Sequence, residues 1–517
     1  MDNPVEPSDP SSDDIASQRR GWLDQRIDWR GIRRTLLDRP VPDGLTWWHT
    51  LGSAALTAFL VQVVTGVVLA TFFAPAPDHA YDSVRYIQTQ VPMGAFLRGM
   101  HTWGSSAMVL LVMAHMVRVF AMGAYKYPRE PNWLLGVALL AITIAFGFTG
   151  YLLPWDQKAY WGTQVGTSLA GTAPVVGGFV ASVLRGGSML GAATLSRFYA
   201  LHVLWLPILL GGFVALHLVL VIRQGIAART AALEAGAPSR TDDPAYPAHY
   251  AAAYAATKRG GVRFWPHIVT KDLVASAAVV LVIAALALVR GATLEPPADP
   301  TDTTYVPQPE WYFLPFYQLL KLFPGSLEST VAVGVPLLLF VALIGLPFFD
   351  RRSARNLRKR PVALASLSVL LGGSGYLLGA ALQELGAMRG ERGPELASAN
   401  SAPLAAVERA GRASFQRQCA SCHVVAGQKG GDEGPELTEV GLKRSTAWLH
   451  SFIESPRLFH PESEMPGFGP PVLSHQEVEE LARYLGTLRG RPGAPPRQPD
   501  FRDTFPQLKA ASPAPGT

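Results

Sequence analysis

The 517-residue chain is poor in charged residues and has almost no cysteine. Charged residues make up 16% of it against 49% hydrophobic residues, a balance that argues against a string of soluble domains. The two cysteines, Cys419 and Cys422, enclose a two-residue loop, so a disulfide between them would stabilise little. The N-terminal region is polar and acidic and lacks the short apolar core of a cleavable signal peptide.

Long apolar runs without charge recur along the chain, and each is long enough to cross a bilayer. They predict an all-α membrane protein with seven spans, listed here: Leu45–Pro77, Gly99–Val117, Trp133–Trp155, Phe198–Ile222, Leu273–Val289, Val331–Phe349 and Pro361–Gln383. Another charge-free run, Ala159–Leu184, is rich in Gly, Thr and Ser and contains Pro174. We interpret it as an interfacial hairpin, with an eighth span as the alternative.

Basic residues indicate how the spans are oriented. They concentrate in the loops after the second, fourth and sixth spans, and basic loops stay on the cytoplasmic side. This predicts a cytoplasmic N-terminus and an outer C-terminus, and it explains the net charge of +6 without a nucleic-acid partner. The predicted domains are residues 1–44 (inner-face segment), 45–222 (four spans), 223–267 (inner-face loop), 268–384 (three spans), 385–404 (linker), 405–490 (soluble α-helical domain) and 491–517 (Pro-rich tail).

Four histidines lie inside two of the apolar runs, where ionisable groups are costly and usually functional. His101 and His115 are fourteen residues apart, and His202 and His217 are fifteen apart. Each pair falls on one helix face, about 21–22 Å apart along the axis. Both spans run from outside to inside, so His101 with His202 and His115 with His217 would each hold one haem b. The alternative is a set of histidines hydrogen-bonded within the bundle.

Glycines and arginines flank these histidines. Two glycine pairs repeat the fourteen-residue interval on the first and third spans and would leave room for a planar macrocycle: Gly52 with Gly66, and Gly136 with Gly150. The alternative is ordinary small-residue packing. Arg98 and Arg118 lie three residues outside His101 and His115, where they would meet haem propionates or extend towards the interface.

The cysteines belong to the motif Cys419-Ala-Ser-Cys422-His423, which is typical of covalent haem c attachment. The following residues resemble a small class I cytochrome c. The resemblance implies His423 as the proximal ligand and Met465, before Pro466, as the distal one. The competing distal ligands are His450, His460 and His475.

Residues 30–384 resemble cytochrome b of cytochrome bc complexes. The resemblance rests on Gly150-Tyr-Leu-Leu-Pro-Trp-Asp-Gln157, Arg197-Phe-Tyr-Ala-Leu-His202 and Pro309-Glu-Trp-Tyr312. The fifteen-residue histidine interval is closer to the chloroplast-type branch, although this chain is not split after its fourth span. That branch attaches an extra haem through a cysteine, which is Thr50 here. We therefore expect no covalently held haem at this position.

The resemblance also implies two quinone sites. Pro309, Glu310, Trp311 and Tyr312 would frame the outer quinol pocket, with Glu310 as the catalytic proton acceptor. Lys271 and Asp272, with Arg223 as a weaker candidate, would bind quinone at the inner face. For these residues the alternatives are a water-facing loop glutamate and a charge pair at a helix start.

Together these features predict a quinol:cytochrome c oxidoreductase subunit in a bacterial inner membrane. Quinol oxidation outside and quinone reduction inside would be coupled to proton translocation through two haems b. The sequence has no second Cys/His cluster, so a separate Rieske iron–sulfur protein is expected, with a cytochrome c or an oxidase as acceptor and a homodimeric complex. The alternatives are a di-haem anchor of another dehydrogenase and a transporter with a redox-sensing cytochrome.

Overall fold

The computed structural model describes residues 22–488, apart from 228–229, 301–304, 306–307, 324, 400–403, 426–430, 432–433, 439, 445 and 460–462. The predicted Pro-rich tail and His460 therefore lie outside the described residues. Within them, seven helices are long and apolar enough to cross a membrane, which confirms the predicted number of spans. The spans are Trp47–Ala70, Gly94–Ala121, Glu130–Tyr151, Ala192–Gln224, Phe264–Val289, Leu327–Phe349 and Pro361–Gly386.

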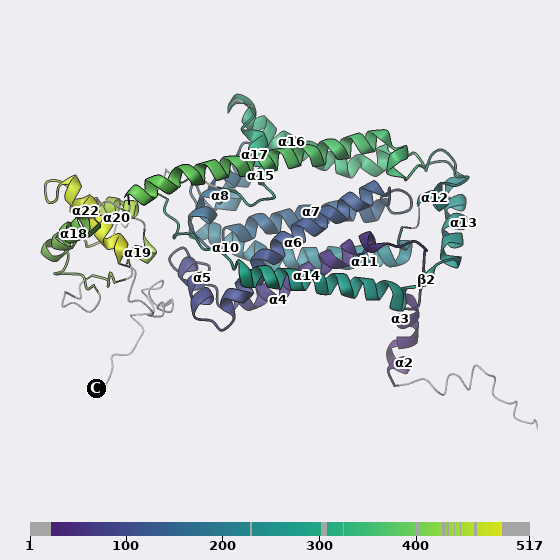
Figure 1. The fold of residues 1–517 in the computed structure, drawn as a ribbon, viewed down its shortest axis with the longest axis horizontal. Helices are drawn as coiled ribbons and strands as arrows, with labels where there is room; N and C mark the ends of the chain where they lie inside the picture. The colour runs from purple at the N-terminus through teal and green to yellow at the C-terminus, as the bar shows by residue number, and fades with distance from the viewer. Residues whose placement is uncertain are drawn as a thin grey trace, which may run out of the picture.

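The first four spans form a bundle whose long helices run side by side (Figure 1). The helix α4 (Leu51–Ala70), preceded by the 3-10 turn η1 (Trp47–Thr50), packs on α6 (Gly94–Ala121), while α7 (Glu130–Tyr151) packs on the fourth span. That span consists of α10 (Ala192–Ala200), the π-helical turn η2 (Leu201–Trp205) and α11 (Leu206–Gln224). Pro207 lacks a backbone N–H, and the helix accommodates this loss with the wider turn η2 just before it.

Three further spans cover this bundle. The turn η3 (Phe264–Ile268) leads into α14 (Val269–Val289), which packs on α4 and α6. The short helix α15 (Leu314–Leu320) precedes α16 (Gly325–Phe349), the turn η4 (Leu357–Lys359) and α17 (Pro361–Ala399). The helix α17 extends beyond the bundle towards the soluble domain (Figure 1). The segment predicted as a linker is thus helical as far as Ala399.

Short helices cover the two ends of the bundle. The end nearer the soluble domain holds α5 (Ala80–Thr89), α8 (Gln157–Gly171) and α9 (Gly177–Arg185). The helices α8 and α9 form a hairpin and are not among the seven span candidates, in keeping with the predicted interfacial segment. The opposite end holds α2 (Trp22–Ile27), α3 (Trp29–Leu36), α12 (Thr230–Glu234) and α13 (Tyr246–Arg259).

At that opposite end, polar contacts join segments far apart in the sequence. The strands β1 (Pro40–Val41) and β2 (Val262–Arg263) pair antiparallel. The buried Lys126 Nζ lies 2.8 Å from Asp350 Oδ1 and donates to the carbonyls of Arg352 and Ala354. Burial lowers the pKa of Lys126 to about 8, although Asp350 opposes this shift. This contact fastens the four-span bundle to the last three spans.

The soluble domain consists of α18 (Leu404–Gln418), α19 (Val440–Lys443), α20 (Thr446–Glu454), α21 (Pro456–Phe459) and α22 (His475–Thr487). Ser474 begins α22 with a capping box, since its hydroxyl accepts from Glu477 N and the Glu477 carboxylate accepts from Ser474 N. Its core packs α18 against α22 around Phe415, Val478 and Leu481. Cys419 joins this core, so the haem-attachment motif is held against it.

Candidate functional site

The structure brings the four membrane histidines together in two pairs. The ring centroids of His101 and His202 are 6.3 Å apart, and those of His115 and His217 are 6.5 Å apart. A metal–imidazole bond of about 2 Å and about 1.2 Å from each nitrogen to its ring centre separate two imidazoles on one iron by about 6.4 Å. Both pairs therefore have the spacing that bis-histidine ligation of a haem iron requires.

Two threonines fix the proton on the outer histidine pair. Thr65 Oγ1 lies 2.9 Å from His101 Nδ1, and Thr149 Oγ1 lies 3.1 Å from His202 Nδ1. Each hydroxyl donates its single hydrogen to its own helix, to the carbonyls of Val61 and Ala145 respectively. Each oxygen can then only accept from the imidazole, so Nδ1 carries the proton. Nε2 keeps its lone pair, which is the form that ligates iron.

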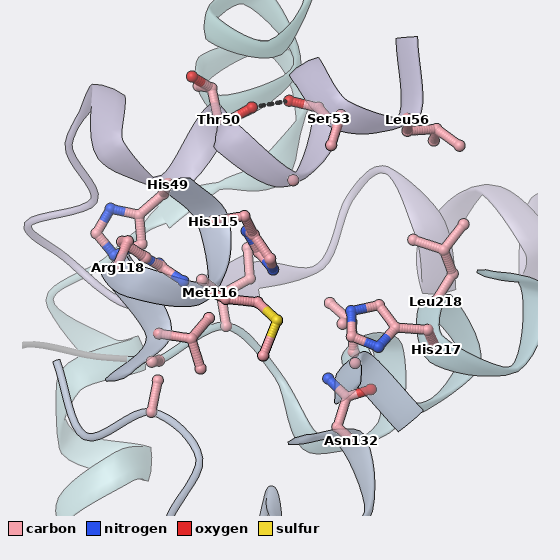
Figure 2. A pocket seen from close by; sticks show the side chains of 18 of the residues that line it. His49, Thr50, Ser53, Leu56, His115, Met116, Arg118, Asn132, His217 and Leu218 are labelled. Atoms are coloured by element: carbon pink, nitrogen blue, oxygen red, sulfur yellow. Dashed lines mark hydrogen bonds between the residues drawn. The ribbon is translucent and has the colours of Figure 1, made fainter. Parts of the chain in front are cut away.

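The inner histidine pair lines a cavity of about 450 Å³. Figure 2 shows His115 and His217 on opposite sides of it, with Asn132 near His217 and Arg118 and His49 near His115. Among the described residues, the Nδ1 atoms of both histidines and the Nε and Nη2 atoms of Arg118 are buried without a hydrogen-bond partner. Buried donors of this kind are expensive. A cofactor carrying carboxylates, such as haem with its propionates, fits the unpartnered guanidinium donors of Arg118.

Each predicted glycine faces one of the histidine rings. A Cβ atom on Gly150 would lie 2.5 Å from His202 Cε1, and one on Gly66 would lie 3.1 Å from His101 Cε1. An added Cβ would lie 3.2 Å from His115 Cε1 at Gly52 and 3.9 Å from His217 Cε1 at Gly136. The glycines therefore admit the ligand rings themselves, most tightly at Gly150.

The two predicted arginines differ in their surroundings. Arg98 donates to Gln88 Oε1 and to the carbonyls of Ala292 and Thr293, so its guanidinium is held by protein groups. Arg118 instead lines the inner cavity with the unpartnered atoms described above. The surroundings of Arg118 suit contact with a haem propionate. Propionate binding by Arg98 stays a prediction.

Sequence reasoning missed Thr65 and Thr149. The signal was present, because each threonine directly precedes one of the predicted glycines and the Thr-Gly pair recurs on the first and third spans. It also missed that His202 lies in the π-helical turn η2, a feature often found at functional sites. Pro207, five residues further on, was the signal for that turn.

The predicted outer residues Pro309–Tyr312 lie in the loop that leads into α15. Glu310 Oε1 is 2.7 Å from Lys158 Nζ at the start of α8, a partner that sequence reasoning missed. Trp311 donates to Ser106 Oγ on α6. Tyr312 packs against Gly147, and burial together with the nearby Glu310 charge raises its pKa, which keeps the phenol protonated. The loop is therefore held against α6, α7 and α8.

The inner cavity also gathers polar groups from α14 and the segment before α4. Lys271 donates to the Leu45 carbonyl, and Asp272 Oδ1 lies 2.7 Å from Ser53 Oγ. Thr50 and His49 line the same cavity, whereas the exposed Arg223 is not among its lining residues. Sequence reasoning passed over His49, which stands at the edge of the first apolar run.

In the soluble domain, His423 Nδ1 lies 2.8 Å from the Pro435 carbonyl. A carbonyl only accepts, so Nδ1 carries the proton and Nε2 is available to a metal. A Cβ on Gly434 would collide with this ring, as one on Gly150 would with His202. Burial raises the pKa of Cys419 to about 11. The described site thus presents one imidazole nitrogen beside the two cysteines.

Met465 lies half-buried in the loop between α21 and α22. Two of its competitors point to Glu454 instead: His475 Nδ1 lies 2.8 Å from its carboxylate, and His450 Nδ1 lies 4.0 Å from it. These contacts favour Met465 among the described candidates for the distal ligand.

Three family models match the chain. Residues 36–225 match "Cytochrome b/b6/petB", residues 297–386 match "Cytochrome b(C-terminal)/b6/petD" and residues 408–489 match "Cytochrome c". The matches cover both histidine pairs, the Pro309–Tyr312 loop and the Cys419–His423 motif.

Similar proteins include cytochrome b6 of Heliobacterium mobile, 42% identical over 40% of this chain and 97% of the relative. Cytochrome b6 of Gracilaria tenuistipitata var. liui is 39% identical over 40% of this chain and 95% of the relative. Among solved structures, a chain of a hyperthermophilic respiratory complex III matches with a TM-score of 0.59 and 27% identity. That match covers 70% of this chain and 90% of the other.

Proposed function

Because the chain belongs to the cytochrome b/b6 family and carries a cytochrome c domain, we propose that it oxidises quinol in a quinol:cytochrome c oxidoreductase. It is a multi-pass membrane protein and an electron-transfer subunit of the cytochrome bc type, with haem b and haem c as cofactors. We place it in a bacterial inner membrane, with the N-terminus cytoplasmic and the cytochrome c domain periplasmic. The basic loops support this orientation.

The observation that carries the proposal is the spacing of the two imidazole pairs, 6.3 and 6.5 Å between ring centroids. His101 and His202 would hold the outer haem b, and His115 and His217 the inner one. Cys419, Cys422, His423 and Met465 would hold haem c. When bound, the three haems supply one-electron transfer, and full ligation by protein leaves the iron no open position.

The chain's own residues would handle the protons of the reaction. At the outer face, Glu310 accepts one proton from quinol beside Trp311 and Tyr312, which contact α6 and α7. At the inner face, Lys271 and Asp272 bind quinone in the cavity beside His115 and supply protons to it. Protons are thus released on one side of the membrane and taken up on the other.

Partners complete the pathway. Outside the two haem c cysteines the sequence has no further cysteine, so an iron–sulfur centre requires a separate Rieske protein. The fused domain would pass electrons to a cytochrome c or an oxidase. We further propose a homodimeric complex, as the family resemblance implies.

The proposal is tested on the purified complex. A reduced-minus-oxidised spectrum should give two haems b and one haem c per chain; a chain without bis-histidine haem b would refute it. Glu310→Gln should slow quinol oxidation at least tenfold and leave that spectrum intact, because general-base catalysis contributes about 10²–10⁴-fold. Unchanged turnover in this variant would remove Glu310 from the proton-accepting role. Full turnover after deletion of the iron–sulfur subunit would exclude the proposed electron path.

A further inference from the structure

Lys158 stands where a helix disfavours a positive charge. It is the second residue of α8, and Asp156 caps this helix by accepting from Ala159 N. A cation in the first turn opposes the helix dipole at a cost of about 0.3–1 kcal/mol. Its Nζ is 2.7 Å from Glu310 Oε1, and the two side chains are 28% and 33% exposed. The same Nζ lies 5.6 Å from the centroid of the Tyr151 ring. Because an ion pair this exposed contributes little stability, stability does not account for the pairing of Lys158 with Glu310.

Other polar groups near Glu310 do not balance its charge. The phenols of Tyr151 and Tyr312 interact with it electrostatically, and Tyr312 is kept protonated by burial and by Glu310. Tyr151 donates to the Gln308 carbonyl, and Tyr305 donates to Glu295. Glu295 and Asp156 add negative charge to the region. Within the described part of the chain, Lys158 is the cation paired with Glu310.

We infer that Lys158 is the positioning residue that holds the Glu310 carboxylate in an ion pair between turnovers, ready to accept a proton from quinol. This inference rests on the proposed function. Oxidation of one quinol releases two electrons and two protons on the outer side, and one of these protons goes to the Glu310 carboxylate. The ion pair is then neutralised, and the carboxyl is released from Lys158. Its proton passes to outer water and the pair re-forms, while the ammonium keeps all of its own protons.

The test is the pH profile of turnover in the purified complex, with duroquinol as donor and soluble ferricytochrome c as acceptor. Lys158→Met removes the charge that stabilises the ionised carboxylate. The acid limb of the profile should therefore move to higher pH by about one unit. The turnover rate should fall up to about tenfold at the acid end and should not change at the alkaline end. Lys158→Arg keeps the charge and should restore the wild-type limb. If Lys158→Met does not accumulate, Lys158→Gln gives the same measurement.

Lys321 offers a matched control, since its Nζ pairs with Glu384 at 2.6 Å and both side chains are similarly exposed. Lys321→Met should leave the limb in place. An unmoved limb in Lys158→Met, or an equal shift in Lys321→Met, overturns the inference. Glu310→Gln distinguishes a failure of the inference about Lys158 from a failure of the proposed role of Glu310. If it abolishes turnover while Lys158→Met keeps the wild-type profile, only the inference fails; if it keeps full turnover, the role of Glu310 itself fails.

Discussion

Replacing Gly150 with alanine should expel the outer haem b. The added Cβ would lie 2.5 Å from His202 Cε1, about 0.9 Å inside the 3.4 Å at which ordinary contact begins. A metal ligand tolerates a displacement of only about 0.2 Å. Overpacking of this kind also costs about 1–3 kcal/mol, shared between the ligand ring, the helix α7 and the turn η2. The imidazole should therefore leave bonding distance of the iron before the bundle unfolds.

Gly136 provides the matched control on the same helix. A Cβ there would lie 3.9 Å from His217 Cε1, an ordinary contact, so Gly136→Ala should retain both haems b. The assay is haem b per chain, from the pyridine haemochrome and the low-spin electron paramagnetic resonance signals of the purified protein. Gly150→Ala should lose one of two haems b and keep haem c. Retention of both haems in Gly150→Ala, or equal loss in Gly136→Ala, would refute the reasoning.

Three further predictions concern the histidine ligand His202, the ion pair of Lys126 with Asp350, and haem c. Thr149→Val removes the acceptor of His202 Nδ1–H and makes this imidazole a less basic ligand. Redox titration should therefore show the potential of the outer haem raised by about 20–60 mV, the equivalent of about 0.5–1.4 kcal/mol. The Thr143 hydroxyl donates to a carbonyl of its own helix, so the control Thr143→Val should leave that potential unchanged. Asp350→Asn should destabilise the protein by about 3 kcal/mol at pH 7, measured by thermal unfolding in detergent, because it leaves the buried Lys126 uncompensated. Burial alone would raise the pKa of Asp350, but hydrogen bonds from Lys126 and Tyr125 hold it below its ordinary value. The ionised Asp350 therefore contributes its full stability above about pH 4 and loses it as the pH falls further. The difference in stability between Asp350→Asn and wild type should narrow over that range; a difference that stays constant with pH would contradict the prediction. Met465→His should lower the haem c potential, since a methionine ligand raises it, whereas the exposed Met189→His should leave it unchanged; equal potentials in both variants would exclude Met465 as a ligand.

The sequence by itself determined the features that depend on composition and on spacing along one helix. Apolar runs fix the number of spans because a bilayer requires a minimum length of uncharged helix. The intervals between His101 and His115, and between His202 and His217, place each pair on one helix face because the helix has a fixed rise and turn. The Cys419–His423 motif is local as well, so it required no knowledge of the fold.

Only the tertiary structure decided which groups from different helices meet. Thr65 and Thr149 act on histidines of neighbouring helices, and their hydroxyls set the imidazole tautomers through contacts that no single-helix pattern contains. The pairing of Lys158 with Glu310 joins residues 152 positions apart, one at the start of α8 and the other in the loop before α15. Arg98 and Arg118 look equivalent in sequence, yet a backbone carbonyl of the loop after α14 accepts from Arg98. Arg118 instead lines the inner cavity with buried nitrogen atoms that have no partner among the described residues. Such differences arise from packing between helices, where a shift of about 1 Å decides whether two polar atoms bond.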